Sequence, residues 1–286
     1  MKTIPDYQLL DSGSGRKLEQ AGPVRIIRPA LNAFWTPSLP AREWDRADAV
    51  FTRESSGGGI WTWKNGGNER LSDLAVRWGG VNLLLKPTHF GHLGFFAEQA
   101  GNWAWLRQRI REMGGTVPAL NLFAYSGGAT IAMAQAGADV CHLDASKGII
   151  EWAGRNQELN PETKGKIRWI CDDAMKFVAR EQRRGRKYRG IVLDPPSFGR
   201  GTQGQVWKIE TGIRSLLDSC RQILDLSGSC FILLSCHSQG FSPVSLGRIL
   251  EETFSHDGGT VESGEMTIPE QSGKHLPAGL YARFSK

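Results

Sequence analysis

Residues 118–135 read Pro-Ala-Leu-Asn-Leu-Phe-Ala-Tyr-Ser-Gly-Gly-Ala-Thr-Ile-Ala-Met-Ala-Gln, and they indicate the fold more clearly than any other stretch. The apolar run through Leu122 is typical of a buried strand, and Gly127 and Gly128 are typical of a sharp turn into a helix. Because glycine has no Cβ, the backbone here can approach a ligand closely, and small residues from Ala129 let the helix pack on its strand. The stretch therefore predicts a strand, a ligand-binding loop and a helix.

A second apolar run follows the predicted helix and ends in an acid. It reads Ala-Asp-Val-Cys-His-Leu-Asp-Ala over residues 138–145, and Asp144 closes the strand. The spacing from Gly127 to Asp144 fits a β-α-β unit, in which a carboxylate at this point binds ribose hydroxyls. The turn lacks the Gly-x-Gly-x-x-Gly pattern that receives a pyrophosphate. The loop therefore favours an adenosine cofactor without a diphosphate, such as S-adenosylmethionine (SAM), over a nicotinamide dinucleotide.

Two further predicted strands also end in carboxylates. Residues 166–174 read Lys-Ile-Arg-Trp-Ile-Cys-Asp-Asp-Ala and close on Asp172 and Asp173, and residues 188–198 read Tyr-Arg-Gly-Ile-Val-Leu-Asp-Pro-Pro-Ser-Phe and reach Asp194. In an open parallel sheet, ligands bind outside the carboxyl ends of the strands. We therefore expect these acids to share one edge with the glycine loop. Aspartate is also common in turns, so a cap explains any one of these acids taken alone, whereas the three together with Pro195 and Pro196 favour a shared site.

Six motifs in a fixed order carry a family resemblance. They are Asn-Leu-Phe-Ala-Tyr-Ser-Gly-Gly from Asn121, Leu-Asp-Ala-Ser from Leu143, Asn-Gln-Glu-Leu-Asn from Asn156, Asp-Ala-x-x-Phe from Asp173, Asp-Pro-Pro-Ser-Phe from Asp194 and Leu-Ser-Cys-His from Leu234. The chain from about Val81 to Lys286 resembles the class I SAM-dependent methyltransferases, and within them the bacterial 23S ribosomal RNA large-subunit methyltransferases that modify cytosine C5 or guanine N7. The resemblance implies an α/β fold: a Rossmann-like, mostly parallel seven-stranded sheet with helices on both faces.

The same resemblance implies SAM as the cofactor and assigns site residues. The positions that match cofactor contacts are Phe123, Tyr125, Ser126, Gly127, Asp144, Ala145, Asp173, Ala174, Asp194 and Gln99. Among them, Asp144 matches the ribose ligand and Asp173 the ligand of the adenine amino group. The implied catalytic residues are Cys236, Asp194 and Phe198. In the cytosine-C5 branch a thiolate adds to the base, whereas transfer to a guanine nitrogen or an exocyclic amine needs no thiol.

Cys236 has two interpretations. It follows the apolar run 230–235, so it should reach the edge where the acids converge, either as a buried thiol that ends a strand or as the nucleophile of the cytosine-C5 branch. The other four cysteines (Cys141, Cys171, Cys220, Cys230) are scattered in apolar contexts, where cysteine packs as a small hydrophobe. Without Cys-x-x-Cys pairs, the set predicts neither disulfides nor a zinc site.

The first 85 residues differ in character from the rest. Short apolar segments alternate with Gly-Gly and Asn-Gly turns, a pattern that predicts antiparallel strands in a separate β-rich region, followed by a SAM-dependent methyltransferase domain over residues 86–286. Trp61 and Trp63 should face the same side of a strand. The tryptophans of this region either pack a small core or form a platform on which RNA bases stack.

Residues 89–99, at the junction, read His-Phe-Gly-His-Leu-Gly-Phe-Phe-Ala-Glu-Gln. Related methyltransferases have Gly-x-Phe-x-Asp-Gln-Arg near this point, in contact with the cofactor. Here Ala100 stands where the arginine is expected, so its role is absent or supplied elsewhere. His89 and His92 lack a third ligand nearby, so we expect no metal.

Net charge and hydropathy indicate which partners and which cellular compartment to expect. The formal net charge is +6 and the pI about 9.2, which suits a polyanion such as RNA. The densest basic run, residues 180–189, precedes the strand that reaches Asp194, so it should lie at the opposite edge of the sheet as a solvated helix end. With neither an apolar run of about 18 residues nor the apolar core of a signal peptide, the sequence predicts a cytoplasmic protein without a membrane partner.

Two classes of function follow from these observations. The first is SAM-dependent methylation of an RNA base, with ribosomal RNA as the foremost substrate. The second is an RNA-binding or assembly factor that keeps the fold without catalysis. A nicotinamide oxidoreductase is disfavoured, because the phosphate-binding loop that it needs is missing.

Overall fold

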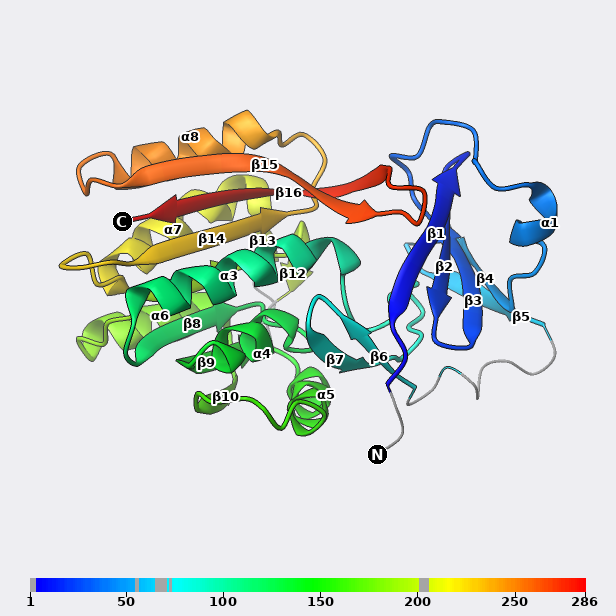
Figure 1. Ribbon diagram of the computed structural model, residues 1–286. Helices are drawn as coiled ribbons and strands as arrows, with labels where there is room; N and C mark the ends of the chain where they lie inside the picture. The colour runs from blue at the N-terminus through cyan, green and yellow to red at the C-terminus, as the bar shows by residue number, and fades with distance from the viewer. Residues whose placement is uncertain (1–3, 55–56, 65–70, 72–73, 201–205) are drawn as a thin grey trace. The chain divides into compact units, whose positions relative to one another are not determined.

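The computed structural model describes residues 4–54, 57–64, 71, 74–200 and 206–286 (Figure 1). Contacts divide the chain into two compact units. The first comprises Met1–Gly101 and Thr267–Ala278, and the second comprises Asn102–Met266 and Gly279–Lys286. Residues 86–101, which the sequence analysis groups with the second domain, therefore pack within the first unit, as does a segment close to the C-terminus.

One seven-stranded sheet is the centre of the second unit, in the order β10-β9-β8-β11-β14-β16-β15. Its strands are β8 (Val117–Leu122), β9 (Ala138–Asp144), β10 (Ile167–Cys171), β11 (Gly190–Leu193), β14 (Phe231–Cys236), β15 (Thr260–Pro269) and β16 (His275–Ser285). The strands from β10 to β14 are parallel, and β16 runs antiparallel to β14. The predicted Rossmann-like α/β fold is confirmed.

Helices cover both faces of this sheet (Figure 1). They are α3 (Ala100–Met113), α4 (Gly128–Gln135), α5 (Lys147–Glu158), α6 (Ala174–Arg183), α7 (Ile209–Ile223) and α8 (Pro243–Phe254). On one face, Leu106 and Ile110 of α3 and Met133 of α4 pack with Phe231 and Leu233 of β14. The apolar positions of α3 recur four residues apart, which is why one side of the helix meets the sheet.

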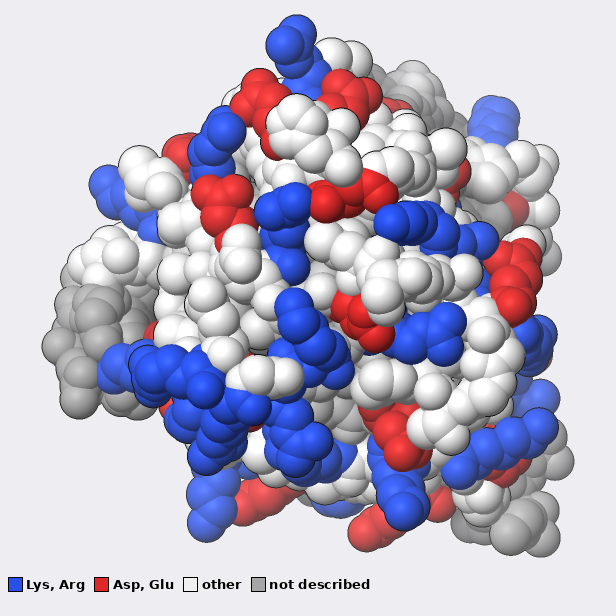
Figure 2. All heavy atoms as spheres, turned by 90° about the vertical axis from the view of Figure 1, so that its left-hand side faces the viewer, with Lys and Arg blue, Asp and Glu red and all other residues white. Residues whose placement is uncertain are grey.

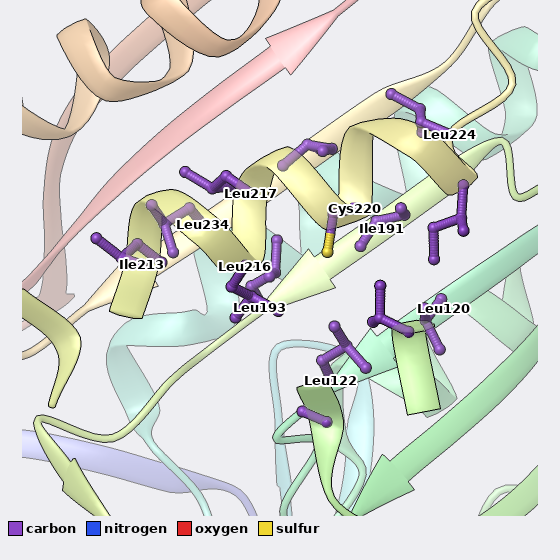
Figure 3. Close-up of a cluster of buried hydrophobic side chains, with 14 of the residues drawn as sticks. Leu120, Leu122, Ile191, Leu193, Ile213, Leu216, Leu217, Cys220, Leu224 and Leu234 are labelled. Atoms are coloured by element: carbon purple, nitrogen blue, oxygen red, sulfur yellow. The ribbon is translucent and has the colours of Figure 1, made fainter. Parts of the chain in front are cut away.

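The opposite face carries the larger apolar cluster, shown in Figure 3. Ile213, Leu216 and Leu217 of α7 lie against Leu193 and Leu234 of the sheet, and all five side chains are buried. Burying an aliphatic side chain of this size stabilises a fold by about 1.5–3 kcal/mol. This cluster therefore holds α7 on this face of the sheet.

The register of the parallel strands aligns their carboxyl ends in one row. Leu143 pairs with Ile170 and Leu122, and Leu193 pairs with Leu122 and Leu234. The residues one step further along the five strands are Cys171, Asp144, Phe123, Asp194 and Ser235. Two of the acids predicted from the sequence thus lie on the same edge as the loop after β8, and Asp173 follows two residues beyond Cys171.

The first unit is built on a five-stranded sheet in sequence order. Its strands are β1 (Tyr7–Gly13), β2 (Arg16–Ala21), β3 (Val24–Pro29), β4 (Ala49–Arg53) and β5 (Gly59–Trp63), with a separate hairpin of β6 (Ala75–Trp78) and β7 (Val81–Leu84) and the short helices α1 (Ala41–Trp44) and η1 (Ala97–Gln99). Trp61 and Trp63 stack with ring centroids 5.6 Å apart, both half-buried. They face the same side of β5, as predicted.

A buried charge cluster lies on β1, β2 and β3 of this unit. Glu19 accepts hydrogen bonds from the Tyr7 hydroxyl at 2.5 Å and from Arg28 at 2.6 and 2.7 Å, and Lys17 lies 3.3 Å away. Burial alone would raise the pKa of Glu19, but the charges of Arg28 and Lys17 and the hydrogen bonds outweigh it and bring the pKa to about 2. Arg28 also donates to the Gly91 carbonyl, which joins the sheet to the segment that leads into η1.

Candidate active site

The loop after β8 has an unusual backbone. Phe123, Tyr125 and Gly127 have φ angles of 57°, 49° and 91°, in the left-handed region that residues with a side chain rarely adopt. Backbone hydrogen bonds hold this shape, since the Ala124 amide donates to Leu143 at 3.0 Å and the Gly127 amide donates to Ala124 at 3.1 Å. Such strained residues cluster at functional sites. The loop that the sequence analysis places under the cofactor is the strained one.

Residues of helix α5 contact the glycine turn and hold it in place. A Cβ on Gly127 would come within 3.2 Å of the Ala153 Cβ, so the close contact with α5 and the positive φ both favour glycine there. Asn156, which is fully buried, donates from Nδ2 to the Ser126 carbonyl at 2.8 Å. Tyr125 packs edge-on against Trp152 of the same helix, 5.8 Å between centroids. The turn is therefore held by α5.

Asp144 is oriented by backbone amides at the end of β9. One carboxylate oxygen accepts from the Tyr125 amide and the other from the Ser146 amide, each at 3.0 Å. Burial raises the pKa of Asp144, and the amide hydrogen bonds counteract only part of that shift. A carboxylate can accept about four hydrogen bonds. The group thus fits a ribose diol, because the carboxylate has acceptor capacity beyond the backbone amides that it already binds.

Asp173 caps helix α6 with one carboxylate oxygen. That oxygen accepts from the Lys176 amide at 3.0 Å, so the interpretation of this acid as a cap is correct. Its neighbour Asp172 forms an ion pair with Arg180 at 2.7 Å and accepts from the Asp173 amide. Of the two adjacent acids, Asp172 is thus neutralised by an arginine. The small residue that follows, Ala174, is buried in the first turn of α6.

Ala145 follows Asp144 at the same edge. Its carbonyl accepts from the Cys171 thiol at 3.6 Å, across the ends of β9 and β10. Cys171 is exposed, which corrects the expectation that it packs as a buried hydrophobe.

Asp194, at the end of β11, is held by the neighbouring strand end. The buried Ser235 donates from Oγ to Asp194 Oδ1 at 2.7 Å, and His237 Nε2 lies 3.7 Å from the same oxygen. Both residues lie in the Leu-Ser-Cys-His motif, in which the sequence analysis selects Cys236 and misses Ser235. Their motif, Leu-Ser-Cys-His, was the available signal, since a motif that ends a strand beside β11 must face the residue that ends β11.

A tryptophan that the sequence analysis also missed supports the loop after Asp194. Trp207 of β13 (Val206–Lys208) donates from Nε1 to the Pro196 carbonyl at 2.7 Å, and its ring lies 5.9 Å from that of Phe123. Phe198 begins β12 (Phe198–Arg200), pairs with Lys208 and is 52 % exposed. One indole therefore contacts both the strained loop after β8 and the Asp-Pro-Pro loop, and Phe198 presents a ring to the outside.

Two predicted residues remain, Cys236 and Gln99, and both are buried. Cys236 ends β14 with a side chain that is 0 % exposed and packed in the apolar cluster beneath α7 and α8. Its sulfur accepts from the Ser238 amide at 3.4 Å, and burial raises the pKa of the thiol. Gln99 ends η1 in the first unit and is 8 % exposed.

Comparison with known proteins identifies the family. Residues 75–255 match the family model of S-adenosylmethionine-dependent methyltransferases. The chain belongs to this family. A crystal structure of a SAM-dependent methyltransferase from Agrobacterium tumefaciens is 39% identical, with a TM-score of 0.89 over 99% of this chain and 91% of that one. A methyltransferase structure from Streptococcus mutans, 14% identical with a TM-score of 0.74 over 98% of this chain and 75% of that one, shares the fold.

Curated relatives of this methyltransferase are similar over part of their length. Ribosomal RNA large subunit methyltransferase I of Aeromonas salmonicida is 28% identical over 59% of this chain and 39% of its own length. Ribosomal RNA large subunit methyltransferase K/L of Vibrio cholerae is 28% identical over 52% of this chain and 20% of its own length. Within the residues that the structure describes, no helix is long and apolar enough to cross a membrane.

Proposed function

We propose that this methyltransferase transfers a methyl group from SAM to a nitrogen of an RNA base, with ribosomal RNA as the foremost substrate. The observation that carries the proposal is the pairing of Asp194 with Ser235 in the same row of strand ends as Asp144 and the strained loop. The RNA substrate is supported by the names of the curated relatives and by the net charge of +6. A cytoplasmic location is part of this proposal.

The cofactor site would use the loop after β8 and the two acids that follow β9 and β10. Asp144 would accept hydrogen bonds from the ribose hydroxyls and Asp173 from the adenine amino group, with Ala145 and Ala174 as small neighbours that leave room for the adenosine. Phe123, Tyr125, Ser126 and Gly127 would line the methionine part. Bound SAM supplies an electrophilic methyl group on a sulfonium, which a nitrogen lone pair can attack directly.

Asp194 would hold the acceptor base. A carboxylate that accepts an N–H hydrogen bond from the base increases electron density on the attacking nitrogen and fixes its direction. Ser235 orients that carboxylate, and the exposed ring of Phe198 would stack on a base that has left its helix. Cys236 has no part in this reaction, in agreement with its full burial and raised pKa.

The second candidate is cytosine C5, favoured by the position of Cys236 at the strand end next to Asp194. Its thiolate would add to C6 of the ring so that C5 becomes nucleophilic, and a base would later remove the C5 proton. This reaction needs a thiolate in contact with the substrate, and nucleophilic cysteines are characteristically exposed with a lowered pKa. Cys236 has the opposite properties, so we place this candidate second.

The two candidates are separated by methylation assays with labelled SAM and total RNA, comparing Cys236→Ala with Asp194→Ala. Nitrogen methylation predicts turnover near the wild-type rate for Cys236→Ala and a large loss for Asp194→Ala. RNA that contains 5-fluorocytosine should form no covalent adduct with the enzyme. A trapped adduct that disappears in Cys236→Ala would establish cytosine C5 as the acceptor instead.

A further inference from the structure

The amino ends of the parallel strands form a pocket of about 460 Å³ at the edge opposite Asp144 and Asp194. Pro118 at the start of β8, Asp139 at the start of β9, Lys166 just before β10 and Tyr188 just before β11 all line it. Its volume is in the range of small-molecule pockets, about 300–1,000 Å³. Every lining residue belongs to the second unit.

Positive charge exceeds negative charge around this pocket. Lys166, Arg168, Arg186 and Lys187 are its cationic lining residues, against the two acids Asp139 and Glu181. Arg183 and Arg184 at the end of α6 add to the excess. Figure 2 faces this side of the molecule, and Lys and Arg side chains gather toward the lower left of the view.

Both acids are already engaged. Asp139 accepts from the Lys166 amide at 2.8 Å. The buried Glu181 accepts from the Tyr188 hydroxyl at 2.7 Å and pairs with Arg184 at 3.2 Å and Arg168 at 3.5 Å. Glu181 therefore offsets charge on Arg168 and Arg184, and within the described residues neither acid forms an ion pair with Lys166 or Arg186.

Three cations have no such partner. Among the residues that the structure describes, the side chains of Lys166, Arg183 and Arg186 form no hydrogen bond or ion pair, and all three residues are exposed. The dipole of α6 accounts for an arginine in its last turn, such as Arg183. It does not account for Lys166 and Arg186, which lie outside the helix and line the pocket.

Apolar and aromatic residues also line this pocket. Val140, Tyr188 and Ile167 contribute to it, and the first two are buried. Exposed cations beside an apolar lining suit a ligand that combines a phosphate with a flat ring, because the cations pair with the phosphate and the apolar residues contact the ring. The expectation that residues 180–189 are only a solvated helix end does not explain the pocket.

We propose that this pocket holds an unpaired nucleotide of the RNA strand, with its phosphate on Lys166 and Arg186, as a second contact away from the reaction centre. This inference rests on the proposed RNA substrate. Strand β9 has seven residues, so the two edges lie about 23 Å apart at about 3.3 Å per residue, and an RNA that reaches both must be extended or folded around the sheet. The contact should therefore affect RNA binding without affecting the chemical step.

The test is RNA affinity across a salt series, measured by anisotropy of a fluorescein-labelled single-stranded RNA of mixed sequence. The double variant Lys166→Gln/Arg186→Gln is compared with Arg248→Gln, an exposed cation on α8, and with Lys208→Gln near Phe198. Each lost phosphate contact lowers the salt slope by about 0.7 for a single strand, so the double variant should lose about 1.4 and Arg248→Gln should match the wild type. The KM for RNA should rise in the double variant while kcat stays unchanged.

A salt slope in the double variant equal to that of Arg248→Gln would overturn the inference. If Lys208→Gln still lowers the slope, the proposed function stands and only the second contact is wrong. If the wild type binds no RNA at all, the proposed function is wrong as well. Adenosine monophosphate is the second probe: binding of this nucleotide that depends on Lys166 and Arg186, without any change in the RNA slope, would assign the pocket to a free nucleotide and contradict the RNA contact.

Discussion

Two residues with side chains, Phe123 and Tyr125, adopt a left-handed backbone in the loop after β8. Each costs about 1–3 kcal/mol, which the fold offsets through the contacts that hold the loop. The conformation directs the Tyr125 amide at Asp144, so the strain fixes the carboxylate that would receive the ribose. The site therefore presents a carboxylate that backbone amides already hold in position as a hydrogen-bond acceptor.

Asp144→Ala should weaken SAM binding by about 1.5–3 kcal/mol, because it removes hydrogen bonds from two hydroxyls to a charged acceptor. Titration calorimetry measures the change. The matched control is Asp139→Ala, which removes the same side chain from the other end of the same strand and should leave SAM affinity as it is. Equal affinities for Asp144→Ala and the wild type would show that the ribose binds elsewhere.

The variant Ser235→Ala tests whether Ser235 positions the Asp194 carboxylate or contributes to SAM binding. It removes the hydrogen bond to Asp194, so kcat should fall about tenfold or more, which corresponds to a bond to a charged group of about 1.5–3 kcal/mol. SAM affinity by calorimetry should stay within a factor of about two, which is about 0.4 kcal/mol, and Ser235→Thr should restore most of kcat. A parallel loss of kcat and SAM affinity would mean that the serine supports the fold rather than Asp194.

Helix α7 contacts the site through Trp207. A Cβ on Gly212 of α7 would lie 2.5 Å from the Trp207 ring, so the glycine makes room for the indole that contacts Pro196 and Phe123. The packing of α7 on the sheet (Figure 3) leaves the helix little freedom to move away. A larger residue at this position must therefore displace the indole.

Gly212→Ala should lower methylation and quench or shift the fluorescence of Trp207 through this displacement. Gly154→Ala in α5 is the control, because a Cβ there meets nothing within 4 Å and alanine in place of a helical glycine should stabilise the fold by about 0.5–1 kcal/mol. Thermal melts and turnover are measured for both variants. Unchanged turnover in Gly212→Ala would exclude Trp207 as a support of the Asp-Pro-Pro loop.

The sequence predicts the edge of the sheet well, because a parallel register places consecutive strand ends together whatever the side chains are. The sequence also indicates that Cys236 is buried, because Ile232, Leu234 and Cys236 are two residues apart and lie on one face of β14. This period favours the buried interpretation of the cysteine over the nucleophile. The contact between Ser235 and Asp194 is harder to predict, because the two residues are 41 positions apart in the sequence. Only the pairing of β11 with β14 brings them together.

Trp207 and the division of the chain could not be predicted. The contact between Trp207 and Phe123 depends on how the segment before α7 turns across the strand ends. The first unit includes Thr267–Ala278, which no local pattern in the sequence assigns to the N-terminal strands. Both features come from long-range packing.

The buried Glu19–Arg28 pair should govern the acid stability of the first unit. The pKa of Glu19 is lowered to about 2 from an ordinary value near 4.5. Its stabilising contribution is therefore complete above pH of about 4.5 and is lost as the pH falls toward about 2. Chemical unfolding followed through the tryptophans, at a series of acidic pH values, should show this loss.

Arg28→Met should destabilise the unit by about 3–5 kcal/mol at neutral pH, because it leaves a buried carboxylate with too little compensation. The double variant Arg28→Met/Glu19→Leu should recover most of that loss and abolish the acid-dependent part. If the single variant is as stable as the wild type, the pair contributes only to the position of Gly91 and its segment.

We propose that this chain methylates a nitrogen of an RNA base. The most direct measurement is mass spectrometric mapping of modified nucleosides in RNA from cells with and without the gene, together with cells that carry Asp194→Ala. We predict one base-nitrogen methylation that is present with the wild-type gene and absent in both other strains. Identical RNA modification in all three strains, or a mark that maps to cytosine C5, would contradict it.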